Sequence, residues 1–581
     1  MIFEHLGWTV LPCAALLALA CQEGRPGVLM QGFYWDVPSP AAGNARAPWW
    51  WDKLASEMDD FAASGITGVW IPPVLKGASG GYSVGYDPFD DYDTGSKPQK
   101  GTIPLRYGTR EQLQRMAAVM RANGLDIILD LVLNHRNGDE GDFRFRYLNA
   151  YGVEGKGRFA KDPDDFHPSV PQDPNVPHEA AAFGRDVAHV NGKGGRIGRG
   201  LIESTGWVTR ALDAQGYRID FAKGISTDWL LEFLNSGEMA GRFAVAEFWD
   251  GDDKAVADYV QSGMQGRCHA FDFPLRDLLR DACKQGGTFN MRDLHRAGFT
   301  GRDAAHSVTF VDNHDTARED PVPNKALAYA CILTSEGTPC VFYSDWRDMN
   351  SVIRNLIWIN RMIAAGPTRE RWKDDDVFCY ERTGGKHLLV GLNDNPNEAK
   401  TITPATGFGP NARLHDYTGH GPDVTTEADG GVQITIPANK NGMGYVCYSV
   451  EGITGTPPRR SFETTQVYEG AADLDIKPAD NREKVDICTI YPKPGHGVTA
   501  QFTWDAGGWT QDTRIELEVT GPGGKIVISK TFRASAPRGE KLAFTPEGPG
   551  PYTFHVQSFD TPEGEPCPPY SLRVTYLGPA G

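Results

Sequence analysis

The sequence contains neither an apolar run near the length of a membrane span nor a compact cluster of lysine and arginine. A membrane-spanning helix needs about 20 consecutive, predominantly apolar residues. The formal net charge is −17, and an acidic protein is repelled by the anionic backbones of DNA and RNA. We therefore predict no membrane span and no nucleic-acid partner, while the oligomeric state is left open.

Cysteine is present in neither a metal-binding nor a disulfide-framework pattern. The ten cysteines include no C-x-x-C pair and no spacing that is typical of a zinc site. We therefore predict neither a zinc site nor a disulfide-dense scaffold, and we expect most of these cysteines to be small, buried, apolar side chains.

The first 26 residues contain a candidate secretion signal without a basic start. Val10 to Ala20 is apolar, ends in the small-residue pattern Ala-Leu-Ala and is followed by Cys21. Glu4 is the only charged residue before this stretch, whereas secretion signals normally begin with basic residues. We interpret 1–26 as a signal segment that predicts an extracellular or cell-envelope location. A cytoplasmic location stays open because the basic residues are missing.

Short apolar runs alternate with helical patterns through residues 27–370. This alternation is typical of βα units, and runs without polar interruptions are typical of strands that are covered on both faces. We predict an α/β fold built on a (β/α)8 barrel. The eight predicted strands are Val28–Tyr34, Gly68–Ile71, Ile127–Leu133, Tyr217–Phe221, Phe243–Ala246, His269–Phe273, Val308–Val311 and Cys340–Tyr343.

Three further regions accompany the predicted barrel. Residues 136–185 are polar, rich in glycine and proline, and much longer than a βα loop, so they predict a small inserted domain after the third strand. Residues 371–450 show the alternation of an antiparallel β domain, and residues 462–581 predict a C-terminal β-sandwich of unassigned role. Within it, Trp504 and Trp509 are either core residues, the commoner role, or a platform for polysaccharide.

Polar side chains gather at the ends of four predicted strands. Active sites of such barrels lie at the carboxyl ends of the strands, so we expect these side chains to form one site. They are Asp130, Asn134 and His135 on the third run, Arg218 and Asp220 on the fourth, Glu247 after the fifth, and Asn313, His314 and Asp315 after the seventh.

Asp220 and Glu247 are the candidate catalytic carboxylates. Hydrolysis of a glycosidic bond with retention needs one ionised carboxylate as nucleophile and one protonated carboxyl as acid. Arg218 lies two residues before Asp220, on the same face of a strand, and predicts a low pKa for Asp220. The apolar residues before Glu247 predict partial desolvation and a raised pKa for that carboxyl.

Four motifs that contain these residues occur in order along the chain. They are Asp130-Leu-Val-Leu-Asn-His135, Gly216-Tyr-Arg-Ile-Asp-Phe-Ala-Lys223, Ala246-Glu-Phe-Trp249 and Phe310-Val-Asp-Asn-His-Asp315. Together they resemble the conserved regions of the α-amylase family, glycoside hydrolase family 13. Gln31-Gly-Phe-Tyr-Trp35 is a further supporting segment, and the stretch that begins with Gly85-Tyr-Asp-Pro-Phe-Asp90 is similar to bacterial liquefying and plant-type α-amylases in particular. The resemblance covers about residues 27–450.

The resemblance implies retaining hydrolysis of internal α-1,4-glucosidic bonds in starch, glycogen or maltooligosaccharides. Asp220 would be the nucleophile, Glu247 the acid/base, and Asp315 a third carboxylate that binds sugar hydroxyls. The substrate-binding residues that it implies are Tyr86, His135, Arg218, Lys223 and His314.

The resemblance also implies a structural Ca²⁺ ion between the barrel and the inserted domain. Asn134 would supply its side-chain oxygen, Asp186 a carboxylate and Gly224 its backbone carbonyl, which are the hard oxygen ligands that Ca²⁺ binds. The inserted domain would supply the remaining ligands, for which the sequence offers Asp162, Asp164 and Asp165.

Two alternatives stay open beside the α-amylase interpretation. One is a maltooligosaccharide-forming or transglycosylating member of the same family. The other is a non-catalytic glucan-binding protein on the same barrel, which the presence of all three carboxylates disfavours. Two departures from the family pattern concern the edges of the cleft: Lys223 is followed by Gly224 instead of histidine, and the connection Ser344-Asp-Trp-Arg347 after the eighth strand is short.

Overall fold

The structure is a computed structural model that describes residues 27–579, except for short internal gaps. The gaps are 140–143, 149–151, 153, 156, 168–182, 191–194, 285, 472–485, 505–513, 534–537 and 560–568. The predicted signal segment 1–26 and Trp509 therefore lie outside the described residues. No helix in the described ranges is long and apolar enough to cross a membrane.

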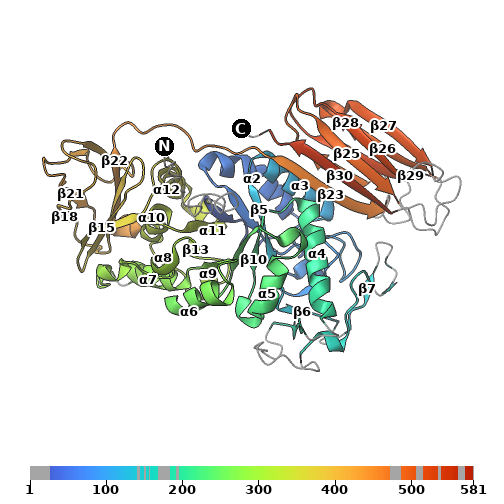
Figure 1. Ribbon diagram of the computed structural model, residues 1–581, viewed down its shortest axis with the longest axis horizontal. Helices are drawn as coiled ribbons and strands as arrows, with labels where there is room; N and C mark the ends of the chain where they lie inside the picture. The colour runs from blue at the N-terminus through green and yellow to red at the C-terminus, as the bar shows by residue number, and fades with distance from the viewer. Residues whose placement is uncertain are drawn as a thin grey trace, which may run out of the picture.

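Eight parallel strands close into a barrel, which confirms the predicted fold class (Figure 1). Each strand overlaps one of the eight predicted apolar runs, and nearly every strand residue is buried because helices cover the outer face while side chains fill the interior. The strands are β1 (Leu29–Gln31), β2 (Gly68–Ile71), β5 (Asp126–Leu131), β10 (Gly216–Ile219), β11 (Phe243–Ala246), β12 (His269–Phe271), β13 (Ser307–Phe310) and β14 (Thr338–Phe342).

Amphipathic helices surround the barrel. Helix α3 begins at the expected capping box, where the Thr109 side chain accepts from the Gln112 backbone N–H and the Gln112 side chain accepts from that of Thr109. The longer helices are α2 (Trp50–Ser64), α3 (Arg110–Ala122), α4 (Arg196–Leu212), α5 (Thr227–Leu234), α7 (Phe273–Lys284), α10 (Ala326–Thr334) and α12 (Asn350–Met362). After β14 the chain enters helix α11 (Tyr343–Asp348) directly, so the last connection is as short as predicted.

The ends of the predicted insert are joined by a short antiparallel pair, β6 (His135–Arg136) with β9 (Arg185–Asp186). Between them lie β7 (Tyr147–Leu148), β8 (Glu154–Gly155) and the turn η2 (Pro163–Asp165). The buried Asp91 carboxylate, which belongs to the barrel, accepts from Arg136 Nη2 at 2.6 Å and from Lys161 Nζ at 2.5 Å. This buried ion cluster ties the insert to the barrel.

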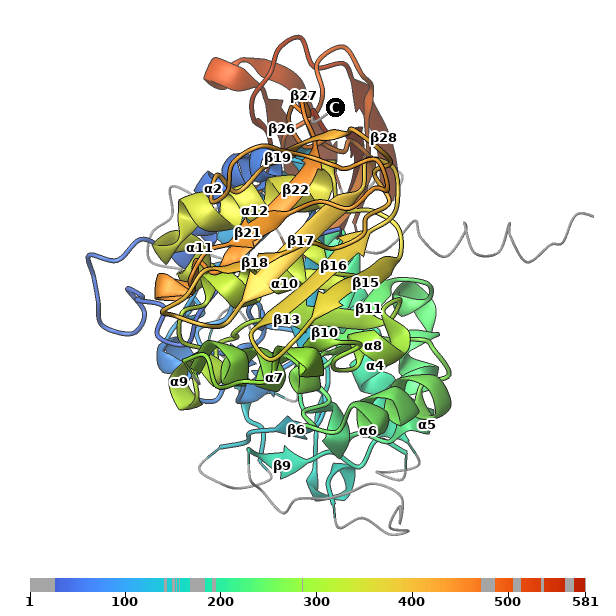
Figure 2. The same ribbon diagram turned by 90° about the vertical axis from the view of Figure 1, so that its left-hand side faces the viewer.

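The chain after α12 forms an antiparallel sheet of six strands and a two-stranded partner (Figure 2). The six strands, in spatial order, are β15 (Thr368–Lys373), β16 (Val377–Arg382), β17 (Leu388–Asn393), β22 (Tyr445–Val450), β19 (Arg413–Asp416) and β20 (Val424–Thr425); the pair is β18 (Lys400–Ile402) with β21 (Ile434–Ile436). Hydrophobic residues from both sheets form a separate small core.

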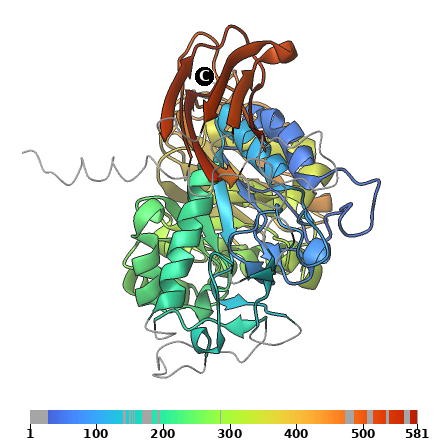
Figure 3. The same ribbon diagram turned by 90° about the vertical axis from the view of Figure 1, so that its right-hand side faces the viewer.

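The last region consists of two four-stranded sheets that enclose a second core (Figure 3). One sheet contains β23 (Glu463–Ala471), β30 (Pro569–Leu577), β25 (Val498–Trp504) and β28 (Gly539–Phe544); the other contains β24 (Asp486–Ile490), β29 (Tyr552–Phe559), β26 (Arg514–Thr520) and β27 (Ile526–Arg533). Trp504 is buried between these sheets, 4.8 Å from the Phe532 ring centroid, so its predicted core role is confirmed.

Strand β24 contacts α3 and strand β23 contacts α4, so the sandwich lies against the helices of the barrel. The sandwich also reaches the inserted domain, since Arg158 Nη1 lies 3.2 Å from Glu469 Oε2 on β23. The seven cysteines that the structure describes are all buried, which agrees with the expectation for most of them.

Candidate active site

Arg218 is a buried guanidinium that contacts carboxylates from three neighbouring strands. Its Nη1 lies 2.9 Å from Asp130 Oδ1 and 2.7 Å from Asp220 Oδ1, while its Nη2 lies 2.5 Å from Glu247 Oε1. The register explains the cluster, since Arg218 on β10 is directly opposite Asp130 on β5 and Val245 on β11. The carboxyl ends of the strands therefore meet as predicted.

The predicted low pKa of Asp220 is wrong. Burial raises the pKa of the Asp220 carboxyl well above its usual range, and the charges of Glu247 and Asp130 raise it further. Arg218 lowers this pKa, but one guanidinium is shared among three carboxylates and does not offset both burial and repulsion. The Asp220 carboxyl is therefore harder to ionise than its contact with Arg218 alone would suggest.

Glu247 follows β11 and accepts hydrogen bonds from two donors, so its surroundings are not purely apolar. Its Oε1 contacts Arg218, and its Oε2 accepts from the Phe221 backbone N–H at 3.1 Å. Phe221 adopts the left-handed backbone conformation, with φ of 41°, in the turn that follows Asp220. A bulky residue in this conformation is uncommon and is typical of functional sites. The turn after Asp220 therefore helps to orient Glu247.

Asp315 is the most accessible of the predicted catalytic carboxylates, with 24% of its side chain exposed. It follows β13, and His314 Nε2 lies 3.3 Å from its Oδ2. Burial raises the pKa of Asp315 to about 7; Glu247 raises it and Arg218 opposes the rise. Asp315 therefore lies within the electrostatic influence of both residues.

Parallel aromatic rings form a wall beside the carboxylates. The ring centroid of Tyr86 lies 5.1 Å from that of His314 and 5.9 Å from that of Trp35, with interplanar angles of 8° and 6°. The Tyr86 hydroxyl donates to Asp130 Oδ2 at 2.8 Å, as does Trp70 Nε1 at 2.9 Å. Such flat apolar faces beside fixed polar groups suit the faces of sugar rings.

The structure places two predicted substrate residues at the margin of this cluster. His135 Nε2 hydrogen-bonds the Tyr86 backbone carbonyl at 2.9 Å, so its contact with the aromatic wall is indirect. Lys223 Nζ pairs with Asp250 Oδ2 at 2.8 Å and is partly exposed. Neither side chain has a described contact with Asp220, Glu247 or Asp315.

Trp35 belongs to the aromatic wall although it was not among the predicted site residues, and Asp130, which was expected at the site from its place at a strand end, had no assigned role. Both lie within motifs that resemble the family, and this was the available signal. The contact of Asp130 with Arg218 depends on the register between β5 and β10, which strand patterns alone do not reveal.

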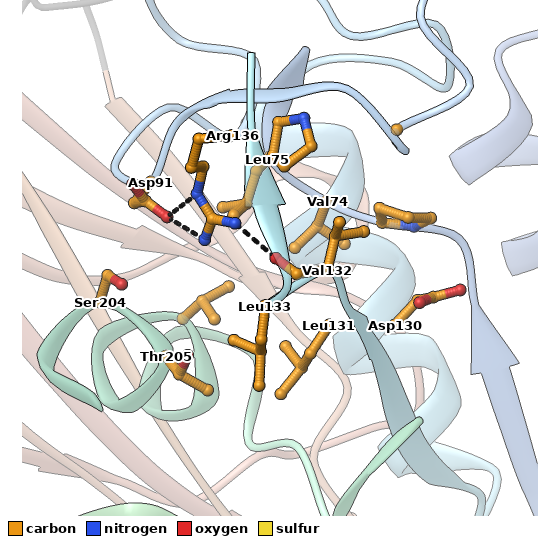
Figure 4. A pocket seen from close by; sticks show the side chains of 14 residues that line it. Val74, Leu75, Asp91, Asp130, Leu131, Val132, Leu133, Arg136, Ser204 and Thr205 are labelled. Atoms are coloured by element: carbon orange, nitrogen blue, oxygen red, sulfur yellow. Dashed lines mark hydrogen bonds and ion pairs between the residues drawn. The ribbon is translucent and has the colours of Figure 1, made fainter. Parts of the chain in front are cut away.

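A small cavity lies behind Asp130, between the end of β5 and helix α4 (Figure 4). It measures about 20 Å³, enough for one water molecule. Its walls are largely apolar, with the Asp91–Arg136 ion pair on one side. The cavity is an internal space rather than a substrate cleft.

The predicted calcium ligands fit a hard cation. Asn134 Oδ1 and both carboxylate oxygens of Asp186 are buried, and within the described ranges they have no hydrogen-bond partner. A side chain built on Gly224 would approach Asn134 Oδ1 to 2.0 Å, so this oxygen lies directly against the Gly224 backbone. Burial raises the pKa of Asp186 to about 7, and no positively charged side chain among the described residues offsets this rise. Unpaired buried oxygens of this kind are costly without a bound cation.

Among the three acidic candidates in the insert, Asp165 fits best. Its Oδ1 is buried without a hydrogen-bond partner in the described part of the chain, whereas Asp164 is exposed. The carboxylate of Asp162 accepts from the Asp164 backbone N–H in the η2 turn. No group of three or more His, Cys, Asp or Glu side chains suited to a metal occurs among the described residues, so amide and backbone oxygens are needed to complete a site.

Comparisons with known proteins agree with this geometry. The family models for "Alpha amylase, catalytic domain" and "Alpha-amylase C-terminal" match residues 51–175 and 388–450. The cytoplasmic α-amylase of Escherichia coli (strain K12) is 30% identical over 483 residues, which cover 70% of this chain and 96% of that protein. The glucan 1,4-α-maltohexaosidase of Bacillus sp. (strain 707) is 28% identical over 506 residues, covering 76% and 94%.

A solved structure extends the likeness in fold to the C-terminal region. The γ-CGTase of alkalophilic Bacillus clarkii superposes with a TM-score of 0.56 at 18% identity and covers 94% of this chain and 96% of its own. The sequence similarity over nearly the whole of the Escherichia coli enzyme, together with the closed barrel, shows that this chain belongs to the α-amylase family of glycoside hydrolases.

Proposed function

We propose that this protein is an α-amylase that hydrolyses internal α-1,4-glucosidic bonds of starch, glycogen or maltooligosaccharides with retention of configuration. The observation that carries the proposal is the Arg218 guanidinium, which bridges Asp220 and Glu247. Retaining enzymes keep their two carboxyl groups about 5–5.5 Å apart. One guanidinium reaches two carboxylates only when they are close, so the bridge supports a retaining mechanism.

In the first step Asp220 attacks the anomeric carbon while Glu247 donates its proton to the glycosidic oxygen. The glycosidic C–O bond breaks, the leaving sugar departs as an alcohol, and an ester forms between Asp220 and the remaining glucan. In the second step Glu247 removes a proton from water, and the water oxygen displaces the Asp220 carboxylate. The products are the two shorter glucans, and Glu247 is again protonated.

The position of the Arg218 guanidinium is suited to this reaction. Asp220 must be ionised when it attacks, and Glu247 must carry the proton that leaves. Arg218 contacts both carboxylates, so its guanidinium compensates the negative charge of Asp220 when Asp220 attacks. Arg218 thereby supports the distribution of charge that the first step requires.

The residues around the pair are proposed to bind the sugar next to the cleaved bond. Tyr86 would stack on its apolar face, and Asp315 and His314 would hydrogen-bond its hydroxyls. His135 and Lys223 would contribute at the margins, where the structure places them.

We also propose a structural calcium ion held by Asn134, Asp186 and the carbonyl of Gly224, with Asp165 as a further ligand. When bound, the ion supplies positive charge for oxygens that have no described hydrogen-bond partner. Gly224 follows Asp220 by four residues, and Asp186 lies at the end of the insert. These residues would therefore couple the insert to the turn that carries the nucleophile.

The length of the products divides two candidate functions within the family. Strand β14 leads directly into helix α11, so this edge of the cleft has no long loop. The short connection favours attack on internal bonds of a long glucan. Relatives named glucan 1,4-α-maltohexaosidase and glucan 1,4-α-maltotetraohydrolase support the maltooligosaccharide-forming alternative.

The test is chromatography of the products from soluble starch and from a long maltooligosaccharide. A broad early mixture supports α-amylase, and one dominant product supports the alternative. Binding of starch without new reducing ends would instead establish a non-catalytic glucan-binding protein.

The division of the chain is likewise proposed, with the barrel at 27–370, the insert at 136–185, the antiparallel domain at 371–450 and the sandwich at 462–581. Export directed by 1–26 stays a prediction, because the relatives include a protein named as a cytoplasmic α-amylase.

A further inference from the structure

The His314 imidazole is buried within the aromatic wall, which favours its neutral form. Only 1% of its side chain is exposed, and the ring centroids of Phe33, Trp35 and Tyr86 lie 5.2, 6.0 and 5.1 Å away. Burial lowers the pKa of His314 well below its usual range, and nearby arginine side chains lower it further. A neutral imidazole carries a single ring proton, so one nitrogen donates and the other accepts.

Gln31, the last residue of β1, contacts the nitrogen of His314 that faces away from Asp315. Its Nε2 lies 2.9 Å from His314 Nδ1. An amide nitrogen only donates, so Nδ1 accepts and the ring proton resides on Nε2. Gln31 is 1% exposed, and its Oε1 has no hydrogen-bond partner in the described part of the chain. Among the described residues, the hydrogen bond to His314 is therefore the side-chain contact that orients this amide.

The opposite nitrogen of the ring agrees with this assignment. His314 Nε2 lies 3.3 Å from Asp315 Oδ2. A carboxyl oxygen accepts hydrogen bonds, so an N–H at Nε2 makes the contact attractive. If the proton were on Nδ1, the lone pair of Nε2 would face the carboxylate. The two N–H groups of Gln31 Nε2 and His314 Nδ1 would then point at each other without an acceptor. Both contacts of the ring are satisfied by one tautomer.

We propose that Gln31 is a positioning residue that sets the tautomer of His314, so that the Nε2–H faces Asp315 and the sugar that binds there. The tautomer follows from contacts of the ring with Gln31 and Asp315, whereas the contact with sugar rests on the proposed function. Gln31 acts through the imidazole and does not reach the reacting atoms. Its role is to present a fixed donor where charge develops, which is how a preorganised site accelerates a reaction.

The test replaces the donor at position 31 by an acceptor. In Gln31→Glu the carboxylate accepts from the ring, so the proton is expected to move to Nδ1. The measurement is a two-bond ¹H–¹⁵N correlation spectrum of the full chain labelled at histidine, with the signals of His314 identified by their loss in His314→Gln. We expect an unprotonated Nδ1 in the wild type and a protonated Nδ1 in Gln31→Glu. With maltoheptaose we expect kcat to fall about 100-fold and KM to change less than about threefold.

A second variant guards against misfolding of the buried glutamate. Gln31→Met removes the donor without adding charge, so the Nδ1 signal should move to the position of a nitrogen without a hydrogen bond, and kcat should fall about tenfold. Gln114→Met, another buried glutamine on helix α3, serves as the matched control. It should leave the His314 signals and kcat unchanged.

A protonated Nδ1 in the wild type would overturn the inference, as would an Nδ1 signal that is the same in Gln31→Met as in the wild type. The spectra report on the ring whether or not the protein cleaves glucan. A wild type with the expected tautomer and no activity would reject the proposed function and leave the assignment of the tautomer intact.

Discussion

Arg218 Nη1 lies 2.7 Å from Asp220 Oδ1, and only the last residue of β10, Ile219, separates the two in the chain. This contact joins the proposed nucleophile to a guanidinium that also contacts Asp130 and Glu247. Changes at Arg218 are therefore expected to affect both activity and stability, whereas changes at Asp220 should affect mainly activity.

Replacing Asp220 by asparagine removes the nucleophile and keeps the shape of the side chain. We expect kcat on maltoheptaose to fall by about 10⁴-fold or more, the scale seen when a covalent catalyst is removed. The melting temperature should not fall much, because a neutral amide at this position would relieve the repulsion from Glu247 and Asp130. A variant that kept more than a small residual rate would contradict the proposed mechanism.

Arg218 is expected to be irreplaceable by lysine. Lysine keeps the positive charge, but its single ammonium lacks the planar fork that contacts Asp220 and Glu247 through separate nitrogens. We expect Arg218→Lys to lower kcat at least about 100-fold. Arg218→Met should in addition destabilise the fold by about 3–5 kcal/mol, because it leaves buried carboxylates without their cation. Chemical denaturation and steady-state kinetics measure the two effects. Equal unfolding free energies for Arg218→Met and wild type would refute the buried cluster.

The carboxyl of Asp315 should make stability depend on pH. Its pKa is about 7 in the folded protein and about 3.9 in an unfolded chain. Between these values the folded state holds a proton that the unfolded state has released. Stability from this group is therefore present at low pH and is lost as pH rises to about 7.

Asp315→Asn removes that loss. The substitution should raise the melting temperature at pH 8 but not at pH 4. The corresponding gain in the free energy of unfolding at pH 8 is on the order of 2–4 kcal/mol before screening of this partly exposed group. Asp59→Asn, at an exposed carboxyl, is the control and should show no such trend. A constant effect of Asp315→Asn across this range would disprove the assigned shift.

Removal of calcium should destabilise the protein through Asp186 and Asn134. We expect a chelator to lower the melting temperature of the wild type, and added Ca²⁺ to restore it in a concentration-dependent manner. The response should be small in Asp186→Asn, which lacks one carboxylate charge, and in Asn134→Ala. Asp164→Asn, an exposed residue of the insert, should retain the full response. An identical response in all four proteins would exclude the proposed ligands.

The sequence predicted the barrel well because the signals for its strands are local. Runs such as Gly68–Ile71 and Phe243–Ala246 match β2 and β11, since residues that are covered on both faces must be apolar whatever their neighbours. The capping box at Thr109 was equally readable, because its hydrogen bonds link residues three positions apart. The order of the motifs likewise indicated the family before any contact was known.

Contacts between strands and the properties that depend on them were decided by the tertiary structure alone. The sequence placed Arg218 beside Asp220, two positions along the same run, but it did not show Asp130 and Glu247 on the same guanidinium. The pKa of Asp220 was therefore predicted in the wrong direction, because it depends on burial and on how many carboxylates share one cation. Strand pattern determines which residues lie at the end of a barrel, whereas closure and register determine which charges meet there.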